Sequence, residues 1–114
     1  MRKSCEEVVE LQRRMNRLTF RRLLELGLSS SDELRLDFTF VADDEEAARQ
    51  LLAYLNTETD YDVKVALGAG VWALTGTTQA TPVTLEILDQ WVEWMAAAGL
   101  EHQCEFDGWG TSIG

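Results

Sequence analysis

Apolar and polar residues alternate over residues 34–41, where only the final Val41 departs from the pattern, and no other segment of this chain has so clear a local pattern. Four apolar side chains fall on one side of the pattern, namely Leu34, Leu36, Phe38 and Phe40. A period of two residues is typical of a β-strand, in which successive side chains point to opposite faces of the sheet. The segment is therefore predicted to be a half-buried strand.

The next segments predict a helix and a β-hairpin. Asp43 and Glu46 have the spacing of a capping box, and the Ala- and Leu-rich residues after them predict a helix that ends near Asn56. Alternation then returns in Tyr61–Leu67, and another strand is predicted from Val71 to about Thr78. The residues Gly68-Ala69-Gly70 between the two segments indicate a tight connection, so these strands should pair with each other.

The C-terminal third predicts one more helix and one more strand. Thr81-Pro82 has the chemistry of a helix start, because the threonine hydroxyl can accept from free amides and proline lacks only an unpaired N–H. This helix is expected to run to about Ala98 and to stop at Gly99. A short strand from His102 to Phe106 should then lead into a glycine turn at residues 107–110.

These elements follow the order β, α, β, β, α, β, which is the order of the ferredoxin-like sandwich. We therefore predict an α+β fold with a four-stranded antiparallel sheet and two helices on one face. An extra N-terminal helix should precede it from Ser4 to Leu26, with Ser4 and Glu7 at capping-box spacing. The predicted division is an N-terminal helix in residues 1–30 and a ferredoxin-like domain in residues 31–114.

The N-terminal helix is predicted to be amphipathic. Its apolar stripe consists of Val8, Leu11, Met15, Leu18 and Leu26. Four arginines gather on the opposite side, namely Arg13, Arg14, Arg17 and Arg21. The stripe should be buried on the body, on the other face of the sheet or against a second copy of the chain.

Charge separates the two parts of the chain. With 114 residues the chain has the size of one domain, and its net charge is −10. Residues 1–30 carry seven basic and four acidic residues, a net +3, whereas residues 31–114 carry three basic and sixteen acidic residues, a net −13. An acidic body suits basic partners and disfavours direct binding of nucleic acid.

The sequence also predicts where the chain resides. No window approaches the roughly 18 apolar residues that span a bilayer. The N-terminus turns acidic where a signal peptide would become apolar. We therefore expect a cytoplasmic protein without membrane contact, in which Cys5 and Cys104 stay reduced.

Catalytic and metal-binding patterns are weak. His102 is the single histidine, the two cysteines are far apart in sequence, and the acidic run at residues 43–46 suits a helix start. Gly68-Ala69-Gly70 lies between strands and not before a helix, so it does not indicate a nucleotide loop. The chain is predicted to be no enzyme and to use no cofactor or metal.

Two clusters of aromatic residues are candidates for binding a partner. Trp91 and Trp94 spread apolar surface over more than one side of the last helix, although aromatic residues at helical spacing are usually core. The C-terminal cluster consists of Glu105, Phe106, Asp107, Gly108, Trp109 and Gly110. Trp109 could anchor a partner or fold back to cover the sheet edge, and the sequence leaves both possibilities open.

The segment Phe106-Asp107-Gly108-Trp109-Gly110-Thr111 resembles the ending of the bacterial regulator of ribonuclease activity B family, the ribonuclease E inhibitors. The resemblance extends back to about residue 33 and includes residues 37–40. It implies a ferredoxin-like fold and a protein without chemistry of its own that binds the scaffold region of ribonuclease E. Two features differ: better-known members continue into an acidic tail, whereas this sequence ends at Gly114, and the leading helix here is rich in arginine.

The leading hypothesis is therefore an adaptor or inhibitor whose acidic body binds a basic segment of ribonuclease E or of another RNA-processing enzyme. The alternative is a structural domain that self-associates as a homodimer through the stripe around Leu11, Met15 and Leu18. Binding of RNA by the arginines of the first helix is a distant third hypothesis, because the acidic body opposes it.

Overall fold

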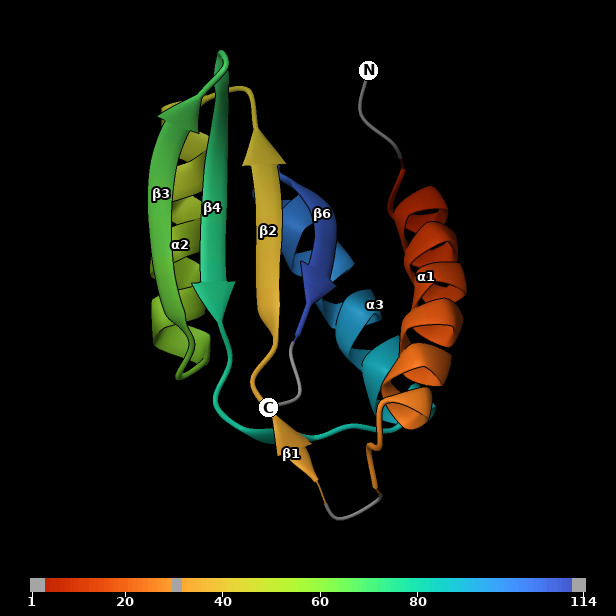
Figure 1. Ribbon diagram of the computed structural model, residues 1–114. Helices are drawn as coiled ribbons and strands as arrows, with labels where there is room; N and C mark the ends of the chain where they lie inside the picture. The colour runs from red at the N-terminus through yellow and green to blue at the C-terminus, as the bar shows by residue number, and fades with distance from the viewer. Residues whose placement is uncertain (1–3, 30–31, 112–114) are drawn as a thin grey trace.

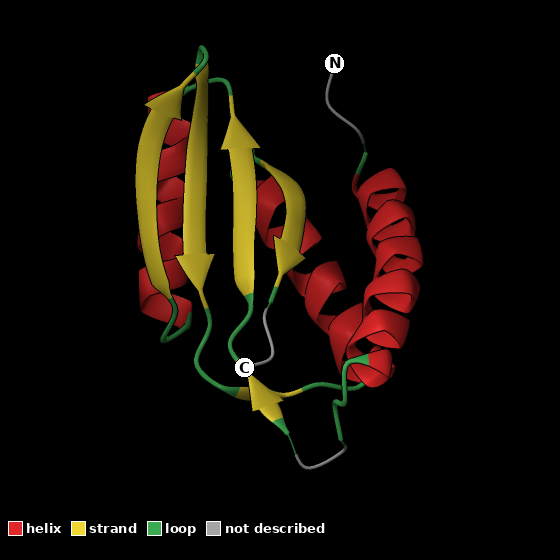
Figure 2. Ribbon diagram, in the orientation of Figure 1, coloured by secondary structure: helices red, strands yellow, loops and turns green. Residues whose placement is uncertain are grey.

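The computed structural model describes residues 4–29 and 32–111 and has an α+β fold (Figures 1 and 2). Its helices are α1 (Cys5–Glu25), α2 (Glu45–Glu58) and α3 (Leu85–Glu101). One antiparallel sheet has the strand order β3-β4-β2-β6, and its strands are β2 (Asp37–Ala42), β3 (Asp62–Gly68), β4 (Val71–Thr77) and β6 (Glu105–Gly110). Two short strands pair with each other, β1 (Glu33–Leu34) and β5 (Thr81–Pro82). The predicted α+β class is confirmed.

The molecule has two main layers and a lateral helix. Figures 1 and 2 show α2 and α3 behind the four-stranded sheet, with α1 beside α3 and next to the edge strand β6. The front face of the sheet is open. It carries polar side chains that include Asp37, Thr39 and Lys64, so the core lies on the helix side.

The predicted alternation defines that core. Phe38, Phe40 and Ala42 of β2 are buried, and apolar side chains of α2, α3 and β6 pack against them. Gly99 lets α3 approach the sheet, because a Cβ atom there would lie 2.8 Å from Cε1 of Phe40. The helix therefore continues through Gly99 to Glu101, and the predicted stop at Gly99 is wrong.

The predicted strand over residues 34–41 is interrupted. β1 and β2 are separate strands, and between them Leu36 bonds to Thr78: the Leu36 N–H donates to Thr78 Oγ1 at 3.0 Å, and the Thr78 N–H donates to the Leu36 carbonyl at 2.9 Å. This pairing holds the chain where it passes from the short sheet to the large one.

The predicted helix start at Thr81-Pro82 is also wrong, because these residues pair with Glu33–Leu34 as β5. The cap of α3 is Thr84, whose hydroxyl accepts from the Ile87 N–H at 3.1 Å. In α2 the cap is Asp44 and not Asp43. The predicted caps therefore have the right residue types, but they lie one residue (Asp43) and three residues (Thr81) before the observed ones.

The predicted glycine turn at residues 107–110 belongs to strand β6. Its pairing with β2 shifts register between Thr39 and Phe40, where Gly108 has a φ of +150°. Such irregularities in a strand are typical of a β-bulge, which glycine tolerates.

The ends of α1 agree with the prediction. Ser4 and Glu7 form the capping box, and Gly27 follows the helix with a φ of +106°. Of the predicted linker at residues 28–32, Ser30 and Ser31 lie outside the described residues. Among the residues that the structure describes, no helix is long and apolar enough to cross a membrane.

Candidate functional site

The buried face of α1 is not the predicted apolar stripe. Val8 is buried as predicted, but Leu11, Met15, Leu18 and Leu26 are exposed. The helix instead buries Gln12 and Asn16, together with Leu23. The pattern identified the helix correctly and its buried face incorrectly, because polar groups elsewhere in the fold need partners from this helix.

Asn16 links α1 to the C-terminal motif. Trp109 Nε1 donates to Asn16 Oδ1 at 2.7 Å, and Asn16 Nδ2 donates to Asp89 Oδ1 of α3 at 3.0 Å. One turn earlier, Gln12 Nε2 donates to the Asp107 carbonyl at 3.3 Å. A buried polar group is stable only when it is hydrogen-bonded, so this network fixes where α1 lies along β6.

The aromatic candidates continue this network into the core. Trp91 lies edge-on to Trp109, with ring centroids 6.1 Å apart, and its Nε1 donates to Tyr61 Oη at 3.0 Å. Burial raises the pKa of Tyr61, the charge of Asp60 raises it further, and the hydrogen bond from Trp91 opposes both. Phe106 is only 2% exposed and packs against Phe40. Phe106, Trp91 and Trp109 therefore hold the fold together.

Trp94 is the candidate that reaches the surface, with 38% exposure. Its ring stacks on Tyr54 of α2 with centroids 6.1 Å apart and 23° between planes, and Tyr54 also contacts His102 at 4.8 Å. Gln90 and Glu101 are exposed one to two turns along α3. We call Tyr54, Gln90, Trp94 and Glu101 the Trp94 surface.

This surface lies on an acidic helix. α3 contains four acidic residues, Glu86, Asp89, Glu93 and Glu101, and no lysine or arginine. Glu93 pairs with Arg13 of α1 at 2.6 Å. The neighbouring arginine Arg14 pairs with Glu10 of its own helix at 2.7 Å. Two of the four arginines proposed for RNA are thus engaged with carboxylates.

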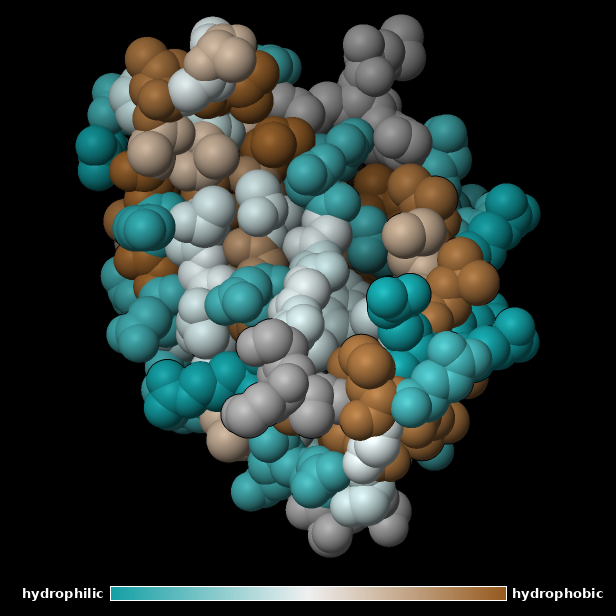
Figure 3. All heavy atoms as spheres, viewed as in Figure 1, coloured by the Kyte–Doolittle hydropathy of each residue, from teal (hydrophilic) through white to brown (hydrophobic). Residues whose placement is uncertain are grey.

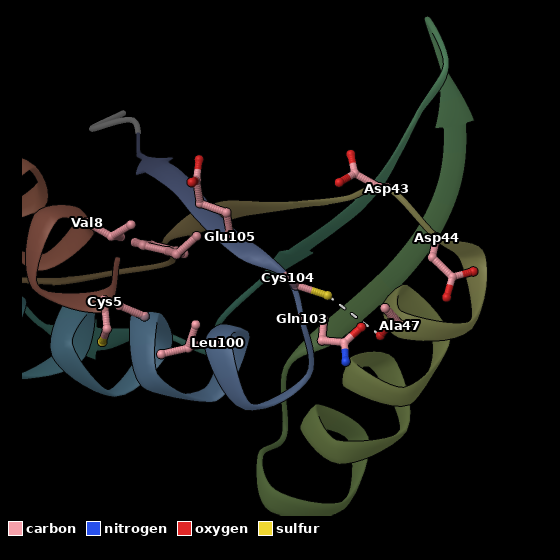
Figure 4. Close-up of a pocket in the computed structure, with 11 residues that line it drawn as sticks. Cys5, Val8, Asp43, Asp44, Ala47, Leu100, Gln103, Cys104 and Glu105 are labelled. Atoms are coloured by element: carbon pink, nitrogen blue, oxygen red, sulfur yellow. Dashed lines mark hydrogen bonds between the residues drawn. The ribbon is translucent and has the colours of Figure 1, made fainter. Parts of the chain in front are cut away.

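A cavity of about 320 Å³ lies near the C-terminal end of α3 (Figure 4). Its apolar lining includes Val8, Ala96 and Phe106. Figure 4 shows the carboxylates of Asp43 and Glu105 pointing away from the labelled apolar side chains of Val8 and Leu100. The cavity can hold a small apolar group.

The remaining candidates of the C-terminal motif lie along β6. Asp107 is exposed, whereas Glu105, Gly108 and Gly110 are half-buried. The structure thus brings Glu105 to the cavity and Trp109 to α1, and it keeps Trp94 apart, where α3 contacts Tyr54 of α2. Contact of these residues with a partner stays a prediction.

Sequence reasoning missed Tyr54, Gln12 and Asn16. Tyr54 meets Trp94 only because α2 and α3 lie side by side, and the chain separates these two residues by a hairpin. The polar pair on α1 carried a weak signal, since Gln12 and Asn16 are four residues apart and so share one face of the helix.

Metal ligands and cysteines are the remaining groups that could carry chemistry. In residues 4–29 and 32–111 no group of three or more His, Cys, Asp and Glu side chains is arranged to hold a metal ion. Cys5 and Cys104 both line the cavity, no disulfide joins them, and Cys104 Sγ approaches the Ala47 carbonyl at 3.6 Å.

A family model described as regulator of ribonuclease activity B matches residues 13–111. This range includes most of α1, the whole sheet and the motif on β6. The chain belongs to the regulator of ribonuclease activity B family. A search of curated proteins gives no match.

The family match corrects the extent of the predicted resemblance. The motifs pointed to residues from about 33 onward, but the regulator of ribonuclease activity B model begins at Arg13. Asn16 and its bond to Trp109 therefore both fall within the matched range. The members of this family are regulators of ribonuclease activity. The function expected of the chain is therefore regulation of a ribonuclease.

Proposed function

We propose that this protein is a non-catalytic regulator that binds ribonuclease E, or a related RNA-processing enzyme, through a basic segment of the enzyme's scaffold region. Membership of the regulator of ribonuclease activity B family is the observation that carries the proposal. The proposed partner is a protein. The chain described here would act in the cytoplasm, where RNA is processed.

The charge distribution supports a basic partner. Residues 31–114 have sixteen acidic and three basic residues, and α3 has four acidic and no basic residues. Opposite charges speed association and fix orientation, whereas apolar and aromatic contacts slow dissociation.

The Trp94 surface is our proposed point of contact. An arginine side chain can stack on an exposed indole and bind a nearby carboxylate at the same time, and Trp94 with Glu101 offers both groups. The stacked Tyr54 ring holds the indole in place, so little side-chain entropy is lost on binding. Asp107 and Glu105, which lie on β6 and apart from Trp94, would add acidic groups to a larger contact area.

We assign α2, α3 and the four-stranded sheet to the ferredoxin-like class. The strand order β3-β4-β2-β6, with both helices behind the sheet, supports this assignment. In such a sandwich the helices cover one face only, so binding to the outer side of α3 leaves the core undisturbed.

A titration with the purified scaffold region of ribonuclease E tests the proposal. We expect binding that weakens as salt rises from about 50 to 500 mM, because the charges on the surface are screened. Trp94→Ala and Glu101→Lys should each weaken binding about tenfold or more, as substitutions of contact residues do. RNA cleavage by the full enzyme should fall when the wild-type protein is added.

Asp62→Lys is the matched control. It reverses one exposed carboxylate on the open face of the sheet, away from α3, and should change binding much less than Glu101→Lys. Salt-insensitive binding, equal effects of the two reversals, or no binding to a ribonuclease would count against the proposal.

Self-association is a second candidate function, because α1 exposes apolar side chains that no described part of the chain covers. Direct binding of RNA is disfavoured by the acidic body and by the ion pairs of Arg13 and Arg14.

A further inference from the structure

α1 exposes a row of large apolar side chains. Leu11, Met15 and Leu18 are 42%, 48% and 61% exposed. Their spacing of four and three residues places them on one face of the helix, and we call them the α1 ridge. Figure 3 shows hydrophobic side chains gathered over α1. A contiguous exposed apolar patch of this kind marks an interaction site.

The contacts of α1 within the chain use other faces. Gln12 and Asn16 bond to β6 and α3, and Arg13 pairs with Glu93. Gln12 and Asn16 each follow a ridge residue in sequence and lie about 100° from it around the helix, and Arg13 lies about 200° from Leu11. The α1 ridge is therefore a flank that remains accessible while α1 stays attached.

The charges of α1 are divided along its length. Its first two turns carry the acidic residues Glu6, Glu7 and Glu10, and the rest of the helix carries the arginines Arg13, Arg14, Arg17, Arg21 and Arg22, followed by Glu25. A helix with this division is complementary to a copy of itself that runs in the opposite direction, and a parallel copy would align like charges.

We propose that two copies of this protein associate through the α1 ridge, with their α1 helices antiparallel about a two-fold axis. The positions support one such axis. Leu11 and Leu18 are centred between residues 14 and 15, and so are Glu7 and Arg22. One axis at that point would pair Leu11 with Leu18 of the second copy and Glu7 with Arg22 of the second copy.

Net charge also favours this part of the molecule for contact between copies. Two molecules of charge −10 repel each other, but residues 1–30 carry seven basic and four acidic residues. Contact through α1 joins the least acidic parts and keeps the two acidic bodies apart. This inference does not depend on the proposed binding of a ribonuclease.

Sedimentation velocity over a dilution series tests the association. The full-length protein should be a dimer that dissociates on dilution, and Leu18→Asp should raise the dimer dissociation constant at least about tenfold. Leu24→Asp is the matched control, because Leu24 is 50% exposed but lies outside the ridge. Circular dichroism should show folded protein for both variants, since both side chains are exposed.

A charge exchange tests the antiparallel direction. Arg22→Glu should weaken the dimer by placing carboxylates opposite each other, and adding Glu7→Arg should restore it. Glu7 also belongs to the capping box of α1, so thermal unfolding of the double variant is compared with that of Glu7→Arg alone. A wild-type monomer at all concentrations, equal effects of Leu18→Asp and Leu24→Asp, or no restoration in the double variant would overturn the proposal.

Discussion

α1 and α2 both lie at the surface of this protein, but they are attached to it by different chemistry. α2 buries only apolar side chains, namely Ala47, Ala48, Leu51 and Leu55. α1 buries Gln12 and Asn16 beside Val8 and Leu23. Apolar contact is non-directional, and its stabilisation grows with the apolar area that is buried. Each hydrogen bond instead needs its partner within about 3 Å.

This difference has a consequence for how each helix is positioned. A shift of α1 by one turn would leave Trp109 Nε1 and the Asp107 carbonyl without their present partners. Unpartnered buried groups are costly, so the polar contacts allow α1 one position along β6. The same position keeps the α1 ridge pointing outward.

The largest effect is expected in α2. Leu51 is fully buried in the main core, and Leu51→Ala should lower the free energy of unfolding by about 2–5 kcal/mol, because it leaves a cavity. Urea unfolding measures the change. Leu52→Ala is the control, since Leu52 is only partly buried, and it should cost clearly less. Equal costs would mean that α2 is not held by its apolar face.

A smaller effect is expected in α1. Asn16→Ala should cost about 1–3 kcal/mol, because Trp109 Nε1 loses its acceptor and Asp89 loses a donor. The control Asn56→Ala changes an exposed asparagine of α2 and should cost within about 0.5 kcal/mol.

A double-mutant cycle sharpens this comparison. Trp109→Phe removes the indole N–H, so its cost and that of Asn16→Ala should add up to more than the cost of the double variant. Strict additivity would show that the bond contributes nothing to the attachment of α1.

The two helices also show what the sequence could and could not predict. The face of α2 and the strand β2 followed from periodicity, since their buried side chains are apolar and their partners are apolar too. For α1 periodicity predicted the helix and its cap but not the face. The partners of Gln12 and Asn16 are 95 and 93 residues away in sequence, so no local pattern reports them.

The same limit applies to the candidate site. Trp94 could be singled out as a surplus aromatic residue on its helix. Its neighbour Tyr54 could not, because the stacking of the two rings depends on how α2 and α3 pack. The motif at residues 106–111 indicated the family, which the family match confirmed. It did not indicate that Trp109 would bond to α1.

The smallest of the three stability effects is expected at Tyr61. This residue is the last in a series of contacts that runs from Asn16 of α1 through Trp109 and Trp91. Tyr61→Phe should cost about 1 kcal/mol at neutral pH, since Trp91 Nε1 loses its acceptor while both groups keep some access to water. The cost should fall at high pH. The pKa of Tyr61 is raised above its ordinary value of 10.0 by burial, so the unfolded chain loses this proton first, and the contribution of Tyr61 to stability declines as pH rises through the folded-state pKa.

Urea unfolding of the two proteins between about pH 8 and 11 measures this decline as a narrowing difference in the free energy of unfolding. The two proteins share every other group that titrates in that range, so the contributions of those groups to the free energy of unfolding cancel in the difference. A difference that stays constant with pH would mean that Tyr61 is no more buried in the folded protein than in the unfolded one. The contacts that link Asn16, Trp109 and Trp91 would then lead to a solvated Tyr61. In that case only Asn16 and Gln12 would determine the position of α1.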